Sequence, residues 1–293
     1  MEIILPILVA DAPDALTELC GVNLIERLLR SLQRLGFRRA IVFSSTPEII
    51  GSELAKRSWA RQQITAQLVP NDTKPVTAQR ILEQDRTARF LIVPANVFCD
   101  ARLLADLAAR DSSTLLVDSN PPHFVQQMIQ NPSGPALLTR EFLLECSDSA
   151  PILEELKQKS ETGEIDILDA AKVDDYIVSM RRHVRPLCFA APQAQQRFLA
   201  ERVILNAAQN GTLDFPAYVH APIETTIVSL LCKTRITPNQ VTIAGFIIGC
   251  SATTAFALGR LGMGLVAALA FGIVDGLDGK LSRVKVETTE RGN

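Results

Sequence analysis

Two secondary-structure patterns follow each other in residues 19–43, LCGVNLIERLLRSLQRLGFRRAIVF. The first is a stripe of leucines at helical spacing, made of Leu24, Leu28, Leu32 and Leu35. Gly36 directly follows this stripe as a helix stop, and the apolar run 40–44 then predicts a β-strand. A helix that leads directly into a strand is typical of α/β folds, so this stretch predicts the architecture of the domain around it.

The same alternation continues through residues 1–200. Apolar runs of strand type lie at 3–10, 90–93 and 114–117, with helical patterns between them. We therefore expect an α/β domain over residues 1–200, with a mostly parallel sheet and flanking helices. The first run has an acid at position 2 and no basic segment before it, which favours a first strand over a signal peptide.

The composition argues against some classes of function. The chain has 293 residues, which favours about two domains, and 30 Lys and Arg residues balance 32 Asp and Glu residues. This balance gives no basic footprint for nucleic acid, so we expect no nucleic-acid partner. The six cysteines form no C-x-x-C motif and predict reduced, mostly buried thiols, and the three histidines are too far apart to favour a zinc site.

No phosphate-binding loop occurs in residues 1–200. The segment after the first strand reads ADAPDALTELCG, without the G-x-G-x-x-G of a dinucleotide fold, and the sequence has no P-loop. The layout, and the stretch 19–43 in particular, resembles a nucleotidyltransferase (cytidylyltransferase)-like domain of the sugar-nucleotide type. That resemblance implies a first loop rich in glycine with an arginine, and both are absent between Ala10 and Gly21.

The same resemblance implies two metal-binding aspartates, whose places fall on Ala95 and on Cys188 or Ala190. Without carboxylates, a complex of Mg²⁺ with a nucleotide has no anchor. Asp100 and Asp118 lie nearby in sequence, and we expect a helix cap and a solvated loop acid, respectively. We therefore expect a degenerate domain that keeps the fold and has lost the transfer chemistry.

Residues 201–236 are predicted to form a linker and a juxtamembrane amphipathic helix. Pro222 suits the first turn of a helix. An apolar stripe follows it, made of Ile223, Ile227, Leu230 and Leu231. Beside a membrane segment, this stripe predicts a helix in the bilayer interface, with Lys233 and Arg235 facing anionic headgroups. The alternative is an amphipathic helix packed on the soluble domain.

Residues 237–293 contain two apolar segments that predict transmembrane helices. The motif TPNQ at 237–240 is a helix start with a capping box, and 241–258 then runs 18 residues without a charge, or about 27 Å of helix. The second segment, 261–274, crosses a bilayer only if its helix includes residues 275–281. A buried helix of a large soluble protein is the alternative for the first segment.

Basic residues flank both outer ends of this hairpin, namely Lys233, Arg235, Lys280, Arg283 and Lys285. The connection between the two segments carries one basic residue, Arg260. By the positive-inside rule, we expect an integral membrane protein whose soluble N-terminal domain and acidic site face the cytoplasm.

Two acids occur within the second predicted helix. If this helix continues through residue 283, one face carries Asp275, Asp278, Gly279 and Ser282. Two carboxylates one turn apart repel unless a cation lies between them, and oxygen ligands suit Mg²⁺, Mn²⁺ or Ca²⁺. Arg283 could hold a phosphate oxygen. The alternative is a helix that ends at Val274 and leaves the acids solvated in a turn.

Residues 275–292, DGLDGKLSRVKVETTERG, resemble the CDP-alcohol phosphotransferase signature D-x-x-D-G-x-x-A-R-x(8)-G-x-x-x-D-x-x-x-D. The matching positions are Asp275, Asp278, Gly279, Arg283 and Gly292, and Ser282 replaces the alanine. The segment RITPNQVTIAGFIIG also resembles the first transmembrane helix of that family.

This resemblance implies a transferase of phospholipid biosynthesis that moves a phosphoalcohol group from a CDP-alcohol donor to an acceptor hydroxyl and releases CMP. Asp275 and Asp278 would hold Mg²⁺ or Mn²⁺, and Gly279, Ser282 and Arg283 would line the nucleotide and phosphate pocket. The third and fourth aspartates, the last being the expected general base, would follow Asn293. We therefore expect the N-terminal portion of such an enzyme, with no catalytic residue of its own and inactive alone.

Two alternatives remain. One is a non-catalytic, membrane-anchored pseudo-nucleotidyltransferase that acts as a binding or scaffold module, and the other is an active cytidylyltransferase with unusual metal ligands. The partners we expect are the CDP-alcohol donor, the acceptor alcohol and the lipid bilayer, and a homodimer is left open. The sequence does not identify the acceptor alcohol.

Overall fold

The computed structural model describes residues 4–10, 13–56, 60–71, 75–121, 123–126, 134–211 and 215–287. The chain divides into two compact units. Unit 1 comprises Met1–Glu18, Asn23–Asp175 and Arg185–Arg197. Unit 2 comprises Leu19–Val22, Tyr176–Val184 and Phe198–Asn293.

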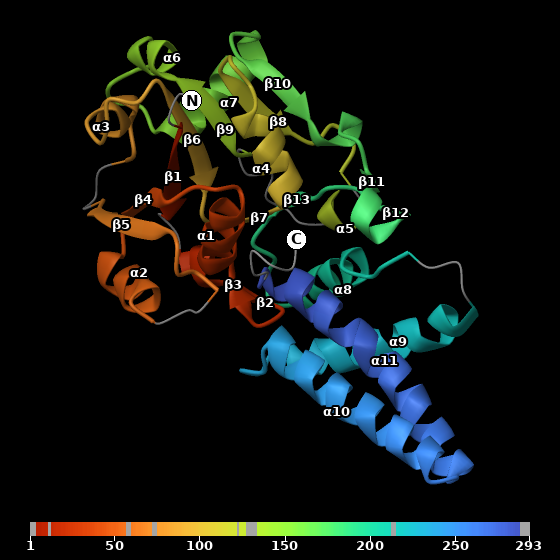
Figure 1. Cartoon of the computed structure of the whole chain (residues 1–293). Coiled ribbons are helices and arrows are strands. Elements are labelled where there is room, and N and C mark those ends of the chain that lie inside the picture. Colours follow the sequence, from red (N-terminus) through yellow and green to blue (C-terminus); the bar gives the residue numbers. More distant parts are fainter. Residues whose placement is uncertain are drawn as a thin grey trace. The chain divides into compact units, whose positions relative to one another are not determined.

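The described part of unit 1 contains a seven-stranded, mostly parallel sheet (Figure 1). In order across the sheet, its strands are β10 (Asp166–Asp169), β8 (Thr114–Val117), β9 (Ala136–Thr139), β6 (Arg89–Pro94), β1 (Ile4–Ala10), β4 (Arg39–Ser44) and β5 (Thr65–Pro70). Strand β9 is antiparallel to both of its neighbours, and the other pairings in this sheet are parallel. The predicted α/β class is therefore confirmed.

Apolar side chains fill both faces of this sheet because successive residues of a strand point to opposite sides. In β1, Leu8 joins one core, together with residues of α1 (Leu24–Arg34), α2 (Pro47–Leu54) and α4 (Ala101–Ala108). Ile7 joins the other, together with residues of α3 (Ala78–Leu82), α6 (Arg140–Leu144) and α7 (Ile152–Thr162). The sheet thus lies between two layers of helices.

Helix α1 forms as the sequence predicts. Its N-cap is Asn23, whose side chain accepts a hydrogen bond of 2.8 Å from the backbone N–H of Glu26. Three leucines of the predicted stripe are fully or almost fully buried, namely Leu24, Leu28 and Leu32. Burying each contributes about 1.5–3 kcal/mol. Gly36, with a φ of +91°, follows the helix in the left-handed conformation that glycine adopts without strain.

Short elements complete the described chain. In and around unit 1 these are η1 (Pro13–Leu16), β2 (Glu18–Leu19), β3 (Val22–Asn23), β7 (Val97–Cys99), α5 (His123–Gln126), η2 (Ala170–Lys172) and β13 (Cys188–Ala190). In unit 2 they are β11 (Tyr176–Ile177), η3 (Val178–Met180) and β12 (Arg182–His183).

Unit 2 is mainly helical in the part that the structure describes. Its longer helices are α8 (Arg197–Ala207), α9 (Phe215–Leu231), α10 (Pro238–Ala257) and α11 (Leu261–Lys285). The prediction that Pro222 occupies a first turn is wrong, because α9 begins at Phe215 and Pro222 lies inside it. Two residues of the predicted apolar stripe, Ile223 and Leu230, are exposed. The buried residues are instead Glu224 and Val228 within α9, and Cys232 just after it.

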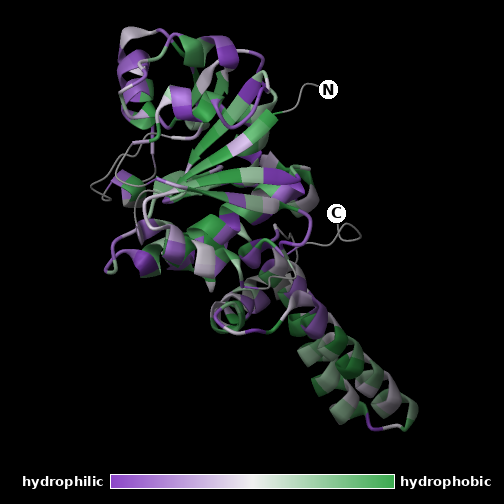
Figure 2. Ribbon diagram, turned by 90° about the vertical axis from the view of Figure 1, so that its left-hand side faces the viewer, coloured by the Kyte–Doolittle hydropathy of each residue, from purple (hydrophilic) through white to green (hydrophobic). Residues whose placement is uncertain are grey.

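Helices α10 and α11 are long and apolar enough to cross a membrane. Figure 2 shows mainly hydrophobic residues along both. Only 17% of the apolar window of α10 and 11% of that of α11 are buried, unlike the core helix of a soluble protein. Glycines bring the pair together: a Cβ at Gly264 would lie 2.6 Å from the ring of Phe256. The predicted capping box of Thr237 and Gln240 is confirmed.

Candidate functional site

The two acids of the C-terminal motif lie inside a continuous helix. Helix α11 runs 25 residues and ends at Lys285, where Val286 adopts a φ of +54° and its N–H bonds to the carbonyls of Ser282 and Arg283. The predicted continuation through residue 283 is confirmed, and the alternative that the helix ends at Val274 is wrong. Asp275, Asp278 and Ser282 therefore share one face of a helix.

The two carboxylates differ in their surroundings. Asp278 is half-buried, and its Oδ2 accepts a hydrogen bond of 2.6 Å from Thr242 Oγ1 on α10. Its Oδ1 accepts a hydrogen bond of 2.6 Å from the backbone N–H of Gly279. Asp275 is exposed, and its carboxylate has no hydrogen bond or ion pair with the described residues. The pair thus consists of one oriented carboxylate and one unengaged carboxylate.

Arg283 lies beside Gly279, and a backbone carbonyl outside α11 fixes its guanidinium. Its Nε donates a hydrogen bond of 2.9 Å to the carbonyl oxygen of Ala208, just beyond α8. Its two terminal nitrogens lie 3.4 and 3.7 Å from the point where a Cβ of Gly279 would stand. Ser282 Oγ donates to the carbonyl oxygen of Gly279 at 3.4 Å. The guanidinium is therefore held at one edge of the acidic face.

A buried polar network on the neighbouring face of α11 escaped the sequence prediction. Lys280 is only 1% exposed, and its Nζ donates to Gln209 Oε1 at 2.5 Å and to Thr225 Oγ1 at 2.6 Å. Gln209 in turn donates to Glu224 Oε2 at 3.1 Å. Gly276 leaves the space for Glu224, because a Cβ there would stand 2.7 Å from Glu224 Oε1. These partners are 55 and 71 residues from Lys280, so no local pattern indicates them.

Two of the lysines expected to flank the hairpin are engaged inside unit 2. Besides Lys280, Lys285 is 5% exposed and donates hydrogen bonds of 2.9 Å to the carbonyls of Thr234 and Ile236. Positive charge in this region therefore serves packing between helices, and the direction in which the helices cross a bilayer stays a prediction. Gly292, the last matched position of the signature, lies outside the described residues.

The residues of the acidic face fit a hard divalent cation as part of its ligand set. Among the described residues, no group of three or more His, Cys, Asp or Glu side chains comes together to hold a metal. Asp275 and Asp278 supply two carboxylates, and no cationic side chain is paired with Asp275. Divalent Mg²⁺ is commonly held by one or two carboxylates, with water and phosphate oxygens completing the shell.

Asp100 and Asp118 of unit 1 are engaged in structural contacts. Asp100 caps α4 through a hydrogen bond of 3.0 Å from Arg102 N and forms an ion pair of 2.9 Å with Arg102, so the expected helix cap is confirmed. The expectation that Asp118 is a solvated loop acid is wrong. Its side chain is 11% exposed and pairs with Arg185 at 2.5 Å. Ala95, at the first position where the resemblance implies a metal ligand, is fully buried.

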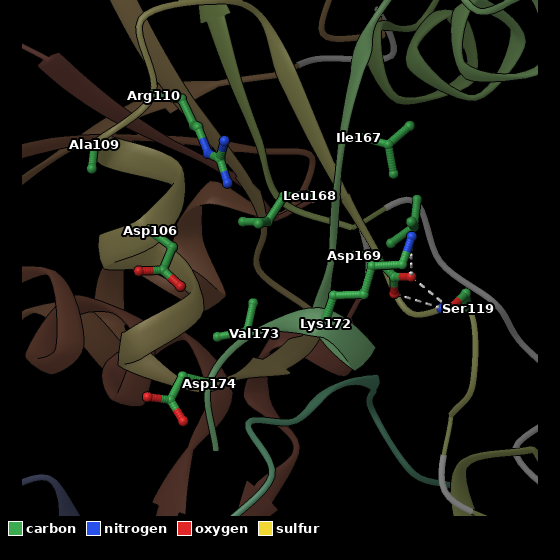
Figure 3. Close-up of a pocket in the computed structure, with 11 residues that line it drawn as sticks. Asp106, Ala109, Arg110, Ser119, Ile167, Leu168, Asp169, Lys172, Val173 and Asp174 are labelled. Carbon is green, nitrogen blue, oxygen red and sulfur yellow. Dashed lines mark hydrogen bonds and ion pairs between the residues drawn. The ribbon is translucent and has the colours of Figure 1, made fainter. Parts of the chain in front are cut away.

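An open pocket of about 710 Å³ lies in unit 1, between α4 and β10 (Figure 3). Charged residues line this pocket. Asp106 lies on α4 and Arg110 just after it, and Lys172 and Asp174 follow β10. Asp169, at the end of β10, accepts hydrogen bonds from Ser119 Oγ and Ser119 N at 2.6 and 3.1 Å. The hydrogen bond from the hydroxyl holds the pKa of Asp169 below its ordinary value. None of the residues predicted as a site lines this pocket.

Residues 19–22 belong to unit 2, where they contact the end of α9. Gly21 has a φ of +75°, and a Cβ there would stand 1.8 Å from the carbonyl oxygen of Cys232, so only glycine fits. Lys233, expected to face lipid headgroups, instead pairs with Glu201 at 3.0 Å. The hydrogen bond to Glu201 raises the pKa of Lys233. Glu201 also accepts a hydrogen bond of 2.9 Å from Cys20 N.

No protein-family model matches the chain, and no curated protein matches it. Solved structures are similar to part of it. The inositol-1-phosphate CTP transferase from T. maritima is 12% identical over 66% of this chain and 90% of its own, with a TM-score of 0.45. A putative glucose-1-phosphate thymidylyltransferase from Bacillus anthracis is 10% identical over 68% of this chain and 96% of its own, with a TM-score of 0.47. Likeness at this level assigns no activity to the chain.

Proposed function

We propose that this chain is the donor-binding portion of a membrane CDP-alcohol phosphotransferase. In this proposal α10 and α11 span the bilayer, and the acidic face of α11 opens toward the cytoplasm. The observation that carries the proposal is the pairing of Asp275 and Asp278 on one face of a continuous apolar helix, with the Arg283 guanidinium at its edge. An acid in such a segment is costly and by default suggests function.

Each residue has a distinct part in binding the donor. Asp275 and Asp278 would hold Mg²⁺ or Mn²⁺, which would neutralise the donor diphosphate when bound. Thr242 orients the Asp278 carboxylate through its hydroxyl. Gly279 lets the donor come close to the backbone, and Arg283 would bind a phosphate oxygen through its terminal nitrogens. Ser282 has a small side chain, which leaves space for the donor on this face of the helix.

The residues present in α11, Asp275, Asp278 and Arg283, support binding of the donor. In the same proposal unit 1 keeps a nucleotidyltransferase-like fold without its chemistry, since Ala95, Cys188 and Ala190 stand where the resemblance implies metal-binding aspartates.

Metal binding by the full chain in lipid nanodiscs tests this function. The probe is Mn²⁺, measured by electron paramagnetic resonance, first alone and then with CDP. We expect Asp275→Asn and Asp278→Asn each to weaken Mn²⁺ binding more than about tenfold. Loss of a group that only supports a metal ligand already lowers metal affinity by about tenfold or more, and loss of a ligand should lower it further. Asp148→Asn, an exposed acid of unit 1, is the matched control and should leave binding unchanged.

Two results would contradict the proposal. One is a wild-type chain that does not bind Mn²⁺, and the other is unchanged affinity in both α11 variants. Binding that depends on the α11 acids but does not respond to CDP would restrict the function to metal binding.

The pocket of unit 1 favours a second candidate function, a binding module anchored in the membrane. Arg110 lines this pocket and could pair with a phosphorylated small molecule, whereas Lys172 already pairs with Asp169 at 3.8 Å. Calorimetry of the full chain with CTP, CDP and inositol phosphate tests this function. Binding that is lost in Arg110→Ala, and kept in the α11 variants, would support it. No heat with any of the three ligands would count against it.

A further inference from the structure

Two cysteines face each other across the small two-stranded sheet of unit 1. Strands β7 and β13 are antiparallel, and Cys99 is in register with Cys188. The N–H of Asp100 bonds to the carbonyl of Leu187 at 2.9 Å, one residue beyond the pair. This bond makes Cys99 and Cys188 a pair without hydrogen bonds between them, the type in which side chains lie closest and Cα atoms are about 4.5 Å apart.

The geometry of such a pair suits a disulfide. Bridged cysteines usually have Cα atoms about 4.4–6.8 Å apart, so the strands need not move to form the bond. Neighbouring contacts hold this register, because the rings of Phe98 and Phe189 stack with centroids 4.8 Å apart. Burial raises the pKa of Cys99, and its thiol donates a hydrogen bond of 3.7 Å to the carbonyl oxygen of Asp100.

The two thiols differ in access. Cys99 is 3% exposed, whereas Cys188 is half-buried. An oxidant in solution therefore reaches Cys188 first, and Cys99 lies next to it as a resolving thiol. Among the other cysteines, Cys20, Cys146 and Cys232 are buried and Cys250 is exposed.

We propose that Cys99 and Cys188 are a redox modification site that forms a reversible disulfide. With glutathione disulfide as oxidant, the Cys188 thiolate attacks one glutathione sulfur and releases one glutathione thiol. The Cys99 thiol then loses its proton to the solvent as its sulfur attacks Cys188 Sγ, and the second glutathione leaves as a thiol. Two protein thiols lose two protons and two electrons, and one glutathione disulfide becomes two glutathione thiols. The bond fixes β13, the last strand of unit 1, to β7.

Peptide mapping of the full chain in nanodiscs tests this site. The protein is equilibrated with glutathione disulfide, its remaining thiols are alkylated, and it is digested with trypsin under non-reducing conditions. The six cysteines fall in six different tryptic peptides, and Cys188 lies in peptide 183–197 because trypsin does not cut between Arg185 and Pro186. We expect the peptide 90–102 linked to 183–197, the loss of two alkylatable thiols, and full recovery after reduction.

Single variants separate the two roles. Cys99→Ser should stop at a mixed disulfide that keeps one glutathione on Cys188, and Cys188→Ser should leave Cys99 as a free thiol. Cys20 and Cys232 of unit 2 are the competing pair, because a hydrogen bond with Cys20 lowers the pKa of Cys232. A link between peptides 1–27 and 203–233 in place of the expected one overturns the proposal. Alkylation of all six cysteines after oxidation also overturns the proposal. This result comes from the wild-type chain, so it does not depend on whether the variants fold.

Discussion

Asp100 and Asp118 of unit 1 differ from the two acids of α11 in the partners of their carboxylates. Asp100 caps a helix and pairs with Arg102, and Asp118 is largely buried against Arg185. In α11, Asp278 is half-buried and bonded to neutral donors, and Asp275 is exposed with no partner among the described residues. The first two acids form ion pairs with arginines of the chain, whereas the two acids of α11 form none with the described residues.

This difference separates acids that stabilise the fold from acids that are available to a ligand. A carboxylate with its own cation and backbone donors gains nothing from an added metal ion. Two carboxylates one turn apart without a cation repel each other, and a divalent ion relieves that repulsion. Substitution of the acids of unit 1 should therefore change the free energy of unfolding, and substitution of the acids of α11 should change metal affinity.

The largest expected effect is the loss of the ion pair of Asp118. Arg185→Met should lower the free energy of unfolding by about 3 kcal/mol, because Asp118 would remain buried without its cation. The double variant Asp118→Asn, Arg185→Met should recover most of that loss. Chemical unfolding followed by the fluorescence of the single tryptophan, Trp59, measures both. Equal stability of wild type and Arg185→Met would show that this pair does not stabilise unit 1.

An effect of intermediate size on stability is expected for Asp100, and none is expected for Asp275. Asp100→Ala removes the N-cap of α4 and should lower stability by about 1 kcal/mol, with Mn²⁺ binding unchanged. Asp275→Ala should leave stability unchanged in the absence of metal and should weaken Mn²⁺ binding. Unfolding curves and Mn²⁺ titrations of both variants test the contrast. A loss of stability of the same size in both variants would remove it.

The smallest expected effect depends on pH. Since hydrogen bonds from Ser119 hold the pKa of Asp169 below its value in the unfolded chain, about 3.9, ionised Asp169 stabilises unit 1 above that pH. This contribution is lost as the pH falls through the folded pKa. Asp169→Asn should therefore be less stable than wild type at pH 7, with a difference that shrinks below about pH 4.

Unfolding midpoints across that pH range measure the difference between wild type and Asp169→Asn. Asp148→Asn, on the exposed turn before α7, serves as the reference substitution. A difference that grows on acidification would contradict the assigned sign.

Local patterns determined much of the fold. The leucine stripe before Gly36, the capping box at 237–240 and the length of the two apolar segments were each sufficient to predict a helix and its approximate ends. They succeed because hydrogen bonds and side chains within a few residues fix helix termini. Pro222 shows the limit, since α9 extends past it on both sides.

The sequence by itself placed Asp275, Asp278, Gly279 and Ser282 on one helix face, because the helical repeat fixes which side chains share a side. Only the tertiary structure decided what meets that face. Thr242 orients Asp278, the carbonyl of Ala208 anchors Arg283, and Gln209 and Thr225 bury Lys280. These partners are 36 to 75 residues away along the chain, and such contacts depend on how helices pack, which no local pattern encodes.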